Sequence, residues 1–338
     1  MDGPATKSPF ACFLHSVMNS TKLTGKLPDS DAILVPEDLR NWSFPGSCLA
    51  VLGHPIGHSI SPQIHNAALG EMSRHNDDYR DWRYFRFDVA SGQLKECLAM
   101  FSKLGFRGLN LTIPHKVEAL EALDWIDSEA AEIGAVNTLV FRENGRCEGY
   151  NTDGQGLERA LKENFGFPLQ GAKIILLGAG GAARAAATRF LRGGCSELWI
   201  GNRSSERMES LIKTLAPNKD QKVQSFLLDN VPPKLLLSFG PSTLVVNATS
   251  LGLAREDDSP FDFSQFPEGG MAYDMIYNPA ETTFLRNART NGLQVSNGLS
   301  MLVHQAARSL RIWTGSEVPV APMFAAAKEV LEERVNTA

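Results

Sequence analysis

The sequence predicts an α/β protein of two domains. Its 338 residues are ample for more than one hydrophobic core. From residue 173 onward, short apolar runs of strand length alternate with longer helical patterns, which is typical of βαβ units and a parallel sheet. Strand and helix patterns also fill residues 48–164. We therefore place a domain boundary near residues 152–170.

The composition excludes several classes of protein. The chain has 33 Lys and Arg against 38 Asp and Glu, which gives a net charge of −5. This charge argues against binding to nucleic acid or to an anionic membrane. No apolar run approaches the roughly 20 residues of a membrane span. The five cysteines are scattered without a C-x-x-C pair, which argues against a disulfide framework or a zinc site. We expect a cytoplasmic protein with no metal, nucleic-acid partner or membrane partner.

Residues 1–46 form an extension that is rich in Ser, Thr, Pro and Gly over 19–46. A short apolar patch at 10–18 lacks a small-residue cleavage site, so a signal peptide is not expected. The extension either drapes over the folded body or stays mobile. Three roles fit this composition: a tail, an oligomer contact or a targeting segment.

The expected elements of the first half begin with a buried strand at 48–53. A helix at 61–72 follows, with Ser61 as its N-cap and Pro62 at its first position. Further expected elements are a strand at 83–89, a helix at 94–104, a strand at 107–113, helical segments through 133, a hairpin of 135–141 and 146–150, and a helix at 156–164.

Lys116 is unusual because it follows an apolar stretch with the alternation of a strand. Period-two alternation would place Leu109, Leu111 and Ile113 on one face and Asn110, Thr112 and Pro114 on the other. Two hydrogen-bonding side chains would then line a strand end, with a lysine just beyond the proline that stops the ladder. This arrangement suits binding a small polyol and moving a proton. The alternative is a solvated lysine at a helix start.

A glycine-rich turn at 178–183 follows a nearly continuous apolar run at 172–177 and precedes a helix expected at 182–191. Its G-x-G-x-x-A form is typical of dinucleotide binding: the first glycine permits the turn, the second admits the pyrophosphate, and the helix N-terminus favours the anion. The candidate cofactor residues are Gly178, Ala179, Gly180, Gly181 and Ala182. The alternative is a purely structural glycine turn.

The next strand, expected at 197–201, ends about 20 residues later, where an NAD enzyme usually carries an acidic residue. This chain has Asn202, Arg203, Ser204 and Arg207 there. Two guanidinium groups and a hydroxyl suit a 2′-phosphate, so the pattern predicts NADP rather than NAD. The alternative is a helix capped by Ser204 and followed by surface charges.

Three further short polar segments lie where loops should meet strand ends. Ser59 and Ser61 stand beside a helix N-terminus, a reasonable carboxylate site, although Ser61 alone would explain capping. Asn137 and Asp153 lie in two segments, 135–138 and 151–154, each of which could individually be a turn.

Taken together, these segments resemble the shikimate dehydrogenase family. The shared blocks are G-H-S-I-S-P-Q-I-H-N, G-L-N-L-T-I-P-H-K, G-A-V-N-T, Y-N-T-D-G, G-A-G-G-A-A-R, N-R-S-S-E-R, D-M-I-Y-N-P-A-E-T and G-L-S-M-L-V-H-Q-A-A. They run in the family's order between residues 53 and 314. The resemblance implies reversible NADPH-dependent reduction of 3-dehydroshikimate to shikimate.

The resemblance also implies roles for individual residues. Lys116 and Asp153 would form the catalytic pair, and Ser59 and Ser61 would hold the substrate carboxylate. Asn110, Thr112, Asn137, Tyr277 and Gln305 would bind ring hydroxyls or frame the pocket. Met275 and Gly298 would position the nicotinamide, and Arg203, Ser204 and Arg207 the 2′-phosphate.

The implied architecture has a substrate domain with a mixed sheet, residues 47–151 plus 299–338. A Rossmann-type NADP domain with a doubly wound parallel sheet would span 152–298. Helices at 301–313 and 323–334 would return to the first domain and bring Gln305 with them. A small-molecule substrate and a monomer or homodimer are expected.

Three departures and two rival functions remain. Ser204 stands where the family commonly has threonine, Ser128 stands where many relatives have an acidic residue, and the extension has no counterpart in compact bacterial members. A quinate or mixed quinate/shikimate dehydrogenase is the nearest rival, but the intact serine pair, Thr112 and the arginines favour shikimate with NADP. A non-catalytic metabolite sensor would be expected to lack Lys116 or Asp153.

Overall fold

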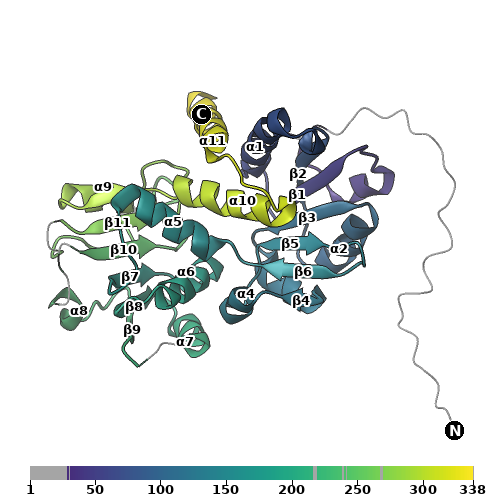
Figure 1. Ribbon diagram of the computed structural model, residues 1–338. Coiled ribbons are helices and arrows are strands. Elements are labelled where there is room, and N and C mark those ends of the chain that lie inside the picture. Colours follow the sequence, from purple (N-terminus) through teal and green to yellow (C-terminus); the bar gives the residue numbers. More distant parts are fainter. Residues whose placement is uncertain are drawn as a thin grey trace, which may run out of the picture.

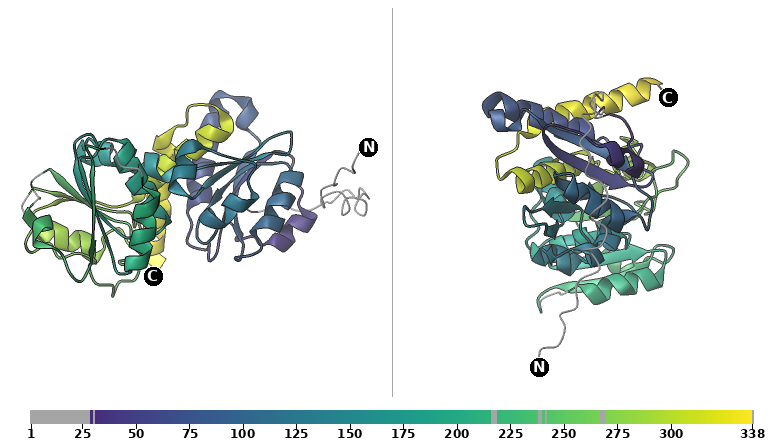
Figure 2. Two further views of the ribbon diagram at one scale, coloured as in Figure 1. Left: turned by 90° about the horizontal axis from the view of Figure 1, so that it is seen from below. Right: turned by 90° about the vertical axis from the view of Figure 1, so that its right-hand side faces the viewer.

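The computed structural model describes residues 29, 31–215, 219–237, 240, 242–266 and 269–337. The chain forms two lobes, each built on a six-stranded sheet, with two long helices between them (Figure 1). The linking helices are α5 (Asp153–Phe165) and α10 (Leu299–Thr314), which pack against each other (Figures 1 and 2). Within the described residues, no helix has both the length and the apolar character needed to cross a membrane.

The first sheet is mixed, as expected. Its strands are β1 (Ser47–Gly53), β2 (Trp82–Asp88), β3 (Phe106–Leu111), β4 (Trp125–Ile126), β5 (Thr138–Phe141) and β6 (Cys147–Tyr150), in the order β2-β1-β3-β5-β6-β4. The first three strands are mutually parallel, while β5 runs antiparallel to β3 and β6. Because β1 and β3 are adjacent and parallel, their carboxyl ends open at one edge of the sheet, where the polar segments follow them.

Helices cover both faces of this sheet. They are α1 (Ser61–His75), α2 (Leu94–Lys103), the short α3 (His115–Glu118), the 3₁₀ turns η3 (Asp77–Tyr79) and η4 (Ala119–Ala122), and α4 (Ser128–Ile133). One core lies under α2 and contains a cluster of phenylalanines. The other core joins β1 and α1 to α10 and to α11 (Val320–Thr337). The C-terminal helices therefore return to the first lobe, which confirms that prediction.

The second sheet is wholly parallel. Its strands are β7 (Lys173–Leu177), β8 (Glu197–Asn202), β9 (Lys222–Leu227), β10 (Thr243–Asn247), β11 (Met271–Asp274) and β12 (Gln294–Ser296). Their order, β12-β11-β10-β7-β8-β9, is the Rossmann order read from the opposite edge. The helices of this lobe are α6 (Gly181–Arg192), α7 (Ser205–Thr214), α8 (Pro233–Leu237) and α9 (Thr283–Thr290). Nearly continuous apolar strands explain why both sheet faces are covered.

The described part of the extension packs on the first lobe. Leu34 forms a parallel bridge with Phe87 of β2, and a 3₁₀ turn, η2 (Pro36–Asn41), follows. Leu39 is buried and Trp42 packs against Phe85 in the core under α2. Residues 31–46 therefore pack along the surface of the first lobe, while residues 1–28 and 30 lie outside the described residues.

Four expectations about local structure were wrong. Ser61 is the first residue of α1 rather than its cap, because Ile60 takes the cap position. The strand β3 ends at Leu111, and Ile113 is 75% exposed instead of sharing the apolar face. Helix α5 begins at Asp153, not three residues later, and the short strand β4 replaces part of an expected helical region.

Candidate functional site

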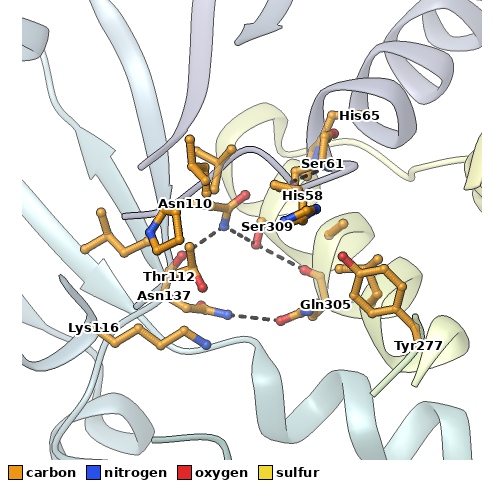
Figure 3. Close-up of a pocket in the computed structure, with 17 residues that line it drawn as sticks. His58, Ser61, His65, Asn110, Thr112, Lys116, Asn137, Tyr277, Gln305 and Ser309 are labelled. Carbon is orange, nitrogen blue, oxygen red and sulfur yellow. Dashed lines mark hydrogen bonds between the residues drawn. The ribbon is translucent and has the colours of Figure 1, made fainter. Parts of the chain in front are cut away.

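A pocket of about 290 Å³ opens at the carboxyl ends of β1 and β3 and is closed on one side by α10. Figure 3 shows Asn137 and Gln305 meeting across this hollow, with Lys116 and Tyr277 on opposite sides of it. All seven residues predicted to bind substrate line the pocket, together with Lys116: Ser59, Ser61, Asn110, Thr112, Asn137, Tyr277 and Gln305. Asp153 lies behind Lys116.

Lys116 and Asp153 form an ion pair at the floor of the pocket. Lys116 Nζ lies 2.5 Å from Asp153 Oδ2, and the carboxylate is 2% exposed while the lysine is 21% exposed. Neighbouring His115 is fully buried, with Nε2 2.7 Å from the carbonyl of Val89 and Nδ1 2.9 Å from Glu118. This anchor fixes the start of α3, so the adjacent lysine is directed to the pocket. A solvated surface lysine is thereby excluded.

Asn137 connects this pair to the rest of the pocket. Its Nδ2 donates to Asp153 Oδ1 at 2.8 Å and reaches Gln305 Oε1 at 3.4 Å, while its Oδ1 accepts the amide of Thr152 at 2.9 Å. Asn151 in turn accepts the amide of Asp153 at 3.0 Å. Both carboxylate oxygens of Asp153 are therefore occupied, which fixes the orientation of the carboxylate toward Lys116.

Gln305 reaches the pocket because α10 packs closely on α5. At Gly156 of α5, an added Cβ would lie 2.9 Å from the amide nitrogen of Gln305. Only glycine allows this approach of the two helices. The prediction that a returning helix carries Gln305 to the site is therefore confirmed in its geometry.

Ser59 and Ser61 lie together at the start of α1. Their hydroxyl oxygens are 3.1 Å apart, and Ser59 Oγ also accepts the amide of Ser61 at 3.3 Å. Within the described residues, neither hydroxyl caps the helix. Two adjacent hydroxyls facing a pocket at a helix N-terminus are suited to an anion such as a carboxylate.

The glycine turn lies between β7 and α6, where the sequence placed it. Gly178 has φ +112°, which disfavours any residue with a side chain, and an added Cβ would lie 2.8 Å from the carbonyl of Ala248. Cβ atoms added at Gly180 or Gly181 would meet nothing within 4 Å, so this side of the turn is open. Ala179 completes the turn, and Ala182 lies in the first turn of α6.

The residues predicted to contact a 2′-phosphate follow β8. Asn202 ends that strand and donates from Nδ2 to the carbonyl of Ser204 at 2.9 Å. Ser204 caps α7 and accepts the amide of Arg207 at 3.4 Å, so the capping interpretation of this residue is also correct. Among the described residues this hydroxyl donates no hydrogen bond, so it can donate one to an anion. Arg203 and Arg207 are both exposed.

Met275 and Gly298 lie against each other at the carboxyl end of β11. A Cβ added at Gly298 would overlap the carbonyl of Met275 at 2.1 Å, so glycine is required there. The segment that follows β11 brings Tyr277 to the pocket. Burial raises the pKa of this tyrosine, so its hydroxyl stays protonated at neutral pH.

Three comparisons relate this geometry to known proteins. Family models described as the shikimate dehydrogenase substrate binding domain, shikimate/quinate 5-dehydrogenase and the shikimate 5′-dehydrogenase C-terminal domain match residues 51–139, 159–235 and 298–328. Shikimate dehydrogenase (NADP(+)) of Moorella thermoacetica is 41% identical over 84% of this chain and 93% of its own length. The chain belongs to the shikimate dehydrogenase family.

Solved structures of this family share the fold. Shikimate 5-dehydrogenase of Thermus thermophilus, in complex with NADP(H) and shikimate, gives a TM-score of 0.72 at 38% identity and covers 84% of this chain and 100% of its own. Quinate dehydrogenase of Corynebacterium glutamicum, in complex with NAD, gives a TM-score of 0.74 at 29% identity, with 84% of this chain and 99% of its own covered. The two enzymes use one scaffold, so the fold alone does not select the substrate.

Sequence reasoning missed three residues of this shikimate dehydrogenase family site: Ser309 and His65, which line the pocket, and Tyr84, which lies beside it. Asn110 Nδ2 donates to Ser309 Oγ at 3.1 Å, and Asn110 Oδ1 accepts from Tyr84 Oη at 2.8 Å. His65 stacks on Tyr84 with ring centroids 3.9 Å apart, and burial lowers the pKa of this histidine to about 4. A neutral histidine is therefore expected in the lining of the pocket. The helical spacing of Gln305 and Ser309 was the available signal for Ser309, whereas Tyr84 carried none.

A buried carboxylate, Asp274, was also missed. It ends β11 and accepts hydrogen bonds from Thr282 Oγ1 at 2.6 Å, Asn247 Nδ2 at 3.0 Å and the amide of Ile276 at 3.0 Å. It is fully buried, and desolvation raises its pKa to about 6 in spite of these donors. These bonds hold the segment that presents Met275 and Tyr277.

Proposed function

We propose that this chain catalyses the reversible NADPH-dependent reduction of 3-dehydroshikimate to shikimate. The observation that carries the proposal is the Lys116–Asp153 pair on the floor of a pocket lined by hydroxyl and amide groups. Membership of the shikimate dehydrogenase family and the NADP-dependent activity named for the Moorella relative support it. The reaction belongs to the formation of aromatic precursors.

The pocket suits a small polyhydroxylated acid. Ser59 and Ser61 would donate to the carboxylate, while Asn110, Thr112, Asn137, Tyr277 and Gln305 would bind ring hydroxyls or frame the pocket. Amide groups both donate and accept hydrogen bonds, which matches hydroxyls that do the same. A volume of about 290 Å³ is small, as befits a single six-membered ring.

Lys116 and Asp153 would handle the proton. During reduction, negative charge develops on the carbonyl oxygen of the substrate, and a positioned ammonium can stabilise and protonate it. Lys116 Nζ would donate this proton, and Asp153, held by Asn137, would orient the ammonium. In the reverse direction the pair would receive the proton of the hydroxyl. When bound, NADPH would supply the hydride.

The second lobe fits NADP. The open face at Gly180 and the N-terminus of α6 suit a pyrophosphate, which needs close approach and free amide donors. Beside them, Arg203, Ser204 and Arg207 provide two cations and a hydroxyl for a 2′-phosphate, and β8 ends without an acidic residue that would repel it. Met275 and Gly298 would position the nicotinamide.

The decisive assay follows absorbance of the reduced cofactor with purified protein. Shikimate and quinate are each offered with NADP and NAD, in four combinations. The proposal expects the highest kcat/KM for shikimate with NADP. Preference for quinate would support the rival dehydrogenase on the same scaffold, and no turnover in any combination would support a metabolite sensor.

The domain division remains part of the proposal: residues 47–151 with 299–338 for substrate and 152–298 for NADP. The pocket residues come chiefly from the first lobe and α10, with Tyr277 from the second. A cytoplasmic location and a monomer or homodimer stay predictions, and light scattering on purified protein would test the oligomeric state.

A further inference from the structure

Arg86 lies in β2, behind the loop of residues 54–60 that leads to Ser59 and Ser61. Its side chain is almost fully buried, with 6% of the residue exposed. Nη1 donates to the carbonyls of Gly57 at 3.2 Å and Ser59 at 2.7 Å. Nη2 donates to the carbonyl of Asp31 at 2.5 Å. One guanidinium thus joins the serine loop to the N-terminal segment.

Within the described ranges no carboxylate lies close enough to form an ion pair with Arg86, although the negative charge of Asp31 acts on it at longer range. The side chain of Asp31 is engaged elsewhere, accepting from Gln63 Nε2 at 3.0 Å. A second guanidinium, of Arg334, donates to the carbonyl of His58 at 2.9 Å, so two cations hold the same loop. Burying a cation without a directly paired anion is unfavourable, and a bound anion nearby would lower that cost.

The N-terminal segment holds Arg86 in place from the outer side. The amide of Leu34 donates to the carbonyl of Arg86 at 3.0 Å, and Leu34 accepts the amide of Asp88 at 2.7 Å. Ile33 lies over the loop, since its Cδ1 is 3.4 Å from a Cβ added at Gly57. Residues 31–35 therefore form a brace, defined here as the segment that covers Arg86 and the serine loop.

The other end of the loop is fixed by a different group. Asp88 Oδ1 lies 2.5 Å from His54 Nδ1, and Asp88 Oδ2 accepts the amide of Ile56 at 3.4 Å. Arg86 therefore governs the half of the loop that carries Ser59, and Asp88 the half that follows β1. Since Ser59 Oγ in turn contacts Ser61, displacement of Ser59 would disturb both hydroxyls.

We propose that Arg86 is a positioning residue for the carboxylate site of Ser59 and Ser61, and that the brace of residues 31–35 keeps it in place. The two neutral hydroxyls orient the bound carboxylate through hydrogen bonds. The guanidinium of Arg86 holds the serine loop in place and adds a positive electrostatic potential that favours the carboxylate. This role rests on the proposed function and extends it to the N-terminal segment.

The test is steady-state kinetics of Arg86→Met in the full chain. We expect the KM for shikimate to rise about 10- to 100-fold, as for loss of a charged hydrogen-bonding group. The KM for NADP should stay within about twofold. Arg83→Met is the matched control, because Arg83 lies in the same strand, is exposed and donates to nearby carbonyls only.

A neutral ligand separates positioning of the carboxylate site from general damage. The methyl ester of shikimate is measured as a substrate or as a competitive inhibitor of shikimate turnover. Arg86→Met should weaken the binding of shikimate much more than the binding of its methyl ester. An unchanged KM for shikimate, or equal weakening of acid and ester, would overturn the proposal.

Two further variants complete the test. If Arg86→Met does not fold, Arg86→Lys replaces it. Lysine keeps the charge but cannot reach all three carbonyls, and the binding of shikimate is again compared with that of its methyl ester. Leu34→Pro removes the amide that donates to the carbonyl of Arg86. If the brace keeps Arg86 in place, this variant should raise the KM for shikimate severalfold. Absence of shikimate turnover by the wild-type chain would instead contradict the proposed function itself.

Discussion

Lys116 Nζ lies 2.5 Å from Asp153 Oδ2, although 37 positions separate the two residues. Each is the product of a rigid local structure: Lys116 follows the buried His115 at the start of α3, and Asp153 is the first residue of α5. The ion pair thus joins the first sheet to the helix that links the lobes. Any change in the angle between α5 and the sheet would alter this distance.

Replacement of Lys116 by methionine should abolish most of the activity while preserving the fold. We expect kcat to fall about 10²- to 10⁴-fold, the usual contribution of general acid–base catalysis. The KM for shikimate should change little, because other groups hold the substrate. Steady-state kinetics measure both constants, and Lys103→Met, at an exposed position at the end of α2, is the control.

Asp153→Asn tests whether the pair acts as a unit. The double variant Lys116→Met/Asp153→Asn should then be hardly slower than Lys116→Met alone, since groups that work together are non-additive. Full additivity of the two effects would contradict the assignment of Asp153 as the partner that orients Lys116.

Gly178 and Gly180 should respond to alanine in opposite ways. Gly180 has φ −81° and free space at its Cβ position, so Gly180→Ala should leave thermal stability almost unchanged but weaken NADP binding at least about tenfold. Gly178→Ala meets a strained φ and the carbonyl of Ala248, and should cost about 1–3 kcal/mol of stability. Unfolding curves without cofactor and NADP titrations distinguish the two. A Gly180→Ala protein that binds NADP normally would exclude pyrophosphate from this turn.

Arg203 and Arg207 should determine the preference for NADP. Arg203→Ala and Arg207→Ala should each raise the KM for NADP about tenfold or more, with little change in the KM for NAD, because only NADP carries the 2′-phosphate. Lys213→Ala, at an exposed position in α7, removes the same charge and serves as the control. An equal rise in the KM for NADP and in the KM for NAD would mean that the arginines do not bind the 2′-phosphate.

Asp274 should make stability depend on pH. Its folded-state pKa is raised to about 6 from an ordinary 3.8, so the folded protein holds this proton more tightly than the unfolded chain. Stability should therefore fall as the pH rises from about 4 to about 6, by up to ~3 kcal/mol from this group, and then level off. Urea unfolding of wild type and Asp274→Asn at pH 4.5 and pH 7 measures the difference.

Asp274→Asn should lose this component of the pH dependence. The asparagine can still accept from Ile276 and Asn247, and its amide can donate to Thr282, so the fold should survive. Asp258→Asn, at an exposed position, is the control. Parallel stability profiles for wild type and Asp274→Asn would show that the carboxylate stays ionised throughout.

Much of this site was predictable because its parts are local patterns. Strand periodicity, the glycine turn after an apolar run and the order of the polar segments required only residues close together in the chain. The cofactor residues and the Lys116–Asp153 pair followed from them with the family resemblance. Errors arose at boundaries: Ile113 has the alternation of a strand residue, but β3 ends before it and the side chain faces solvent.

The remaining features depend on contacts between distant segments. Amino-acid types and spacing were enough to predict two α/β lobes and an NADP-type turn, whereas the catalytic role of Lys116 was implied by the family resemblance. Only the folded chain brought Tyr84 and Ser309 into hydrogen-bond contact with Asn110, buried Asp274 beside the segment that carries Tyr277, and set Arg86 between the serine loop and residues 31–35. Burial and partner choice decide what a polar side chain does, and both are properties of tertiary packing rather than of local sequence.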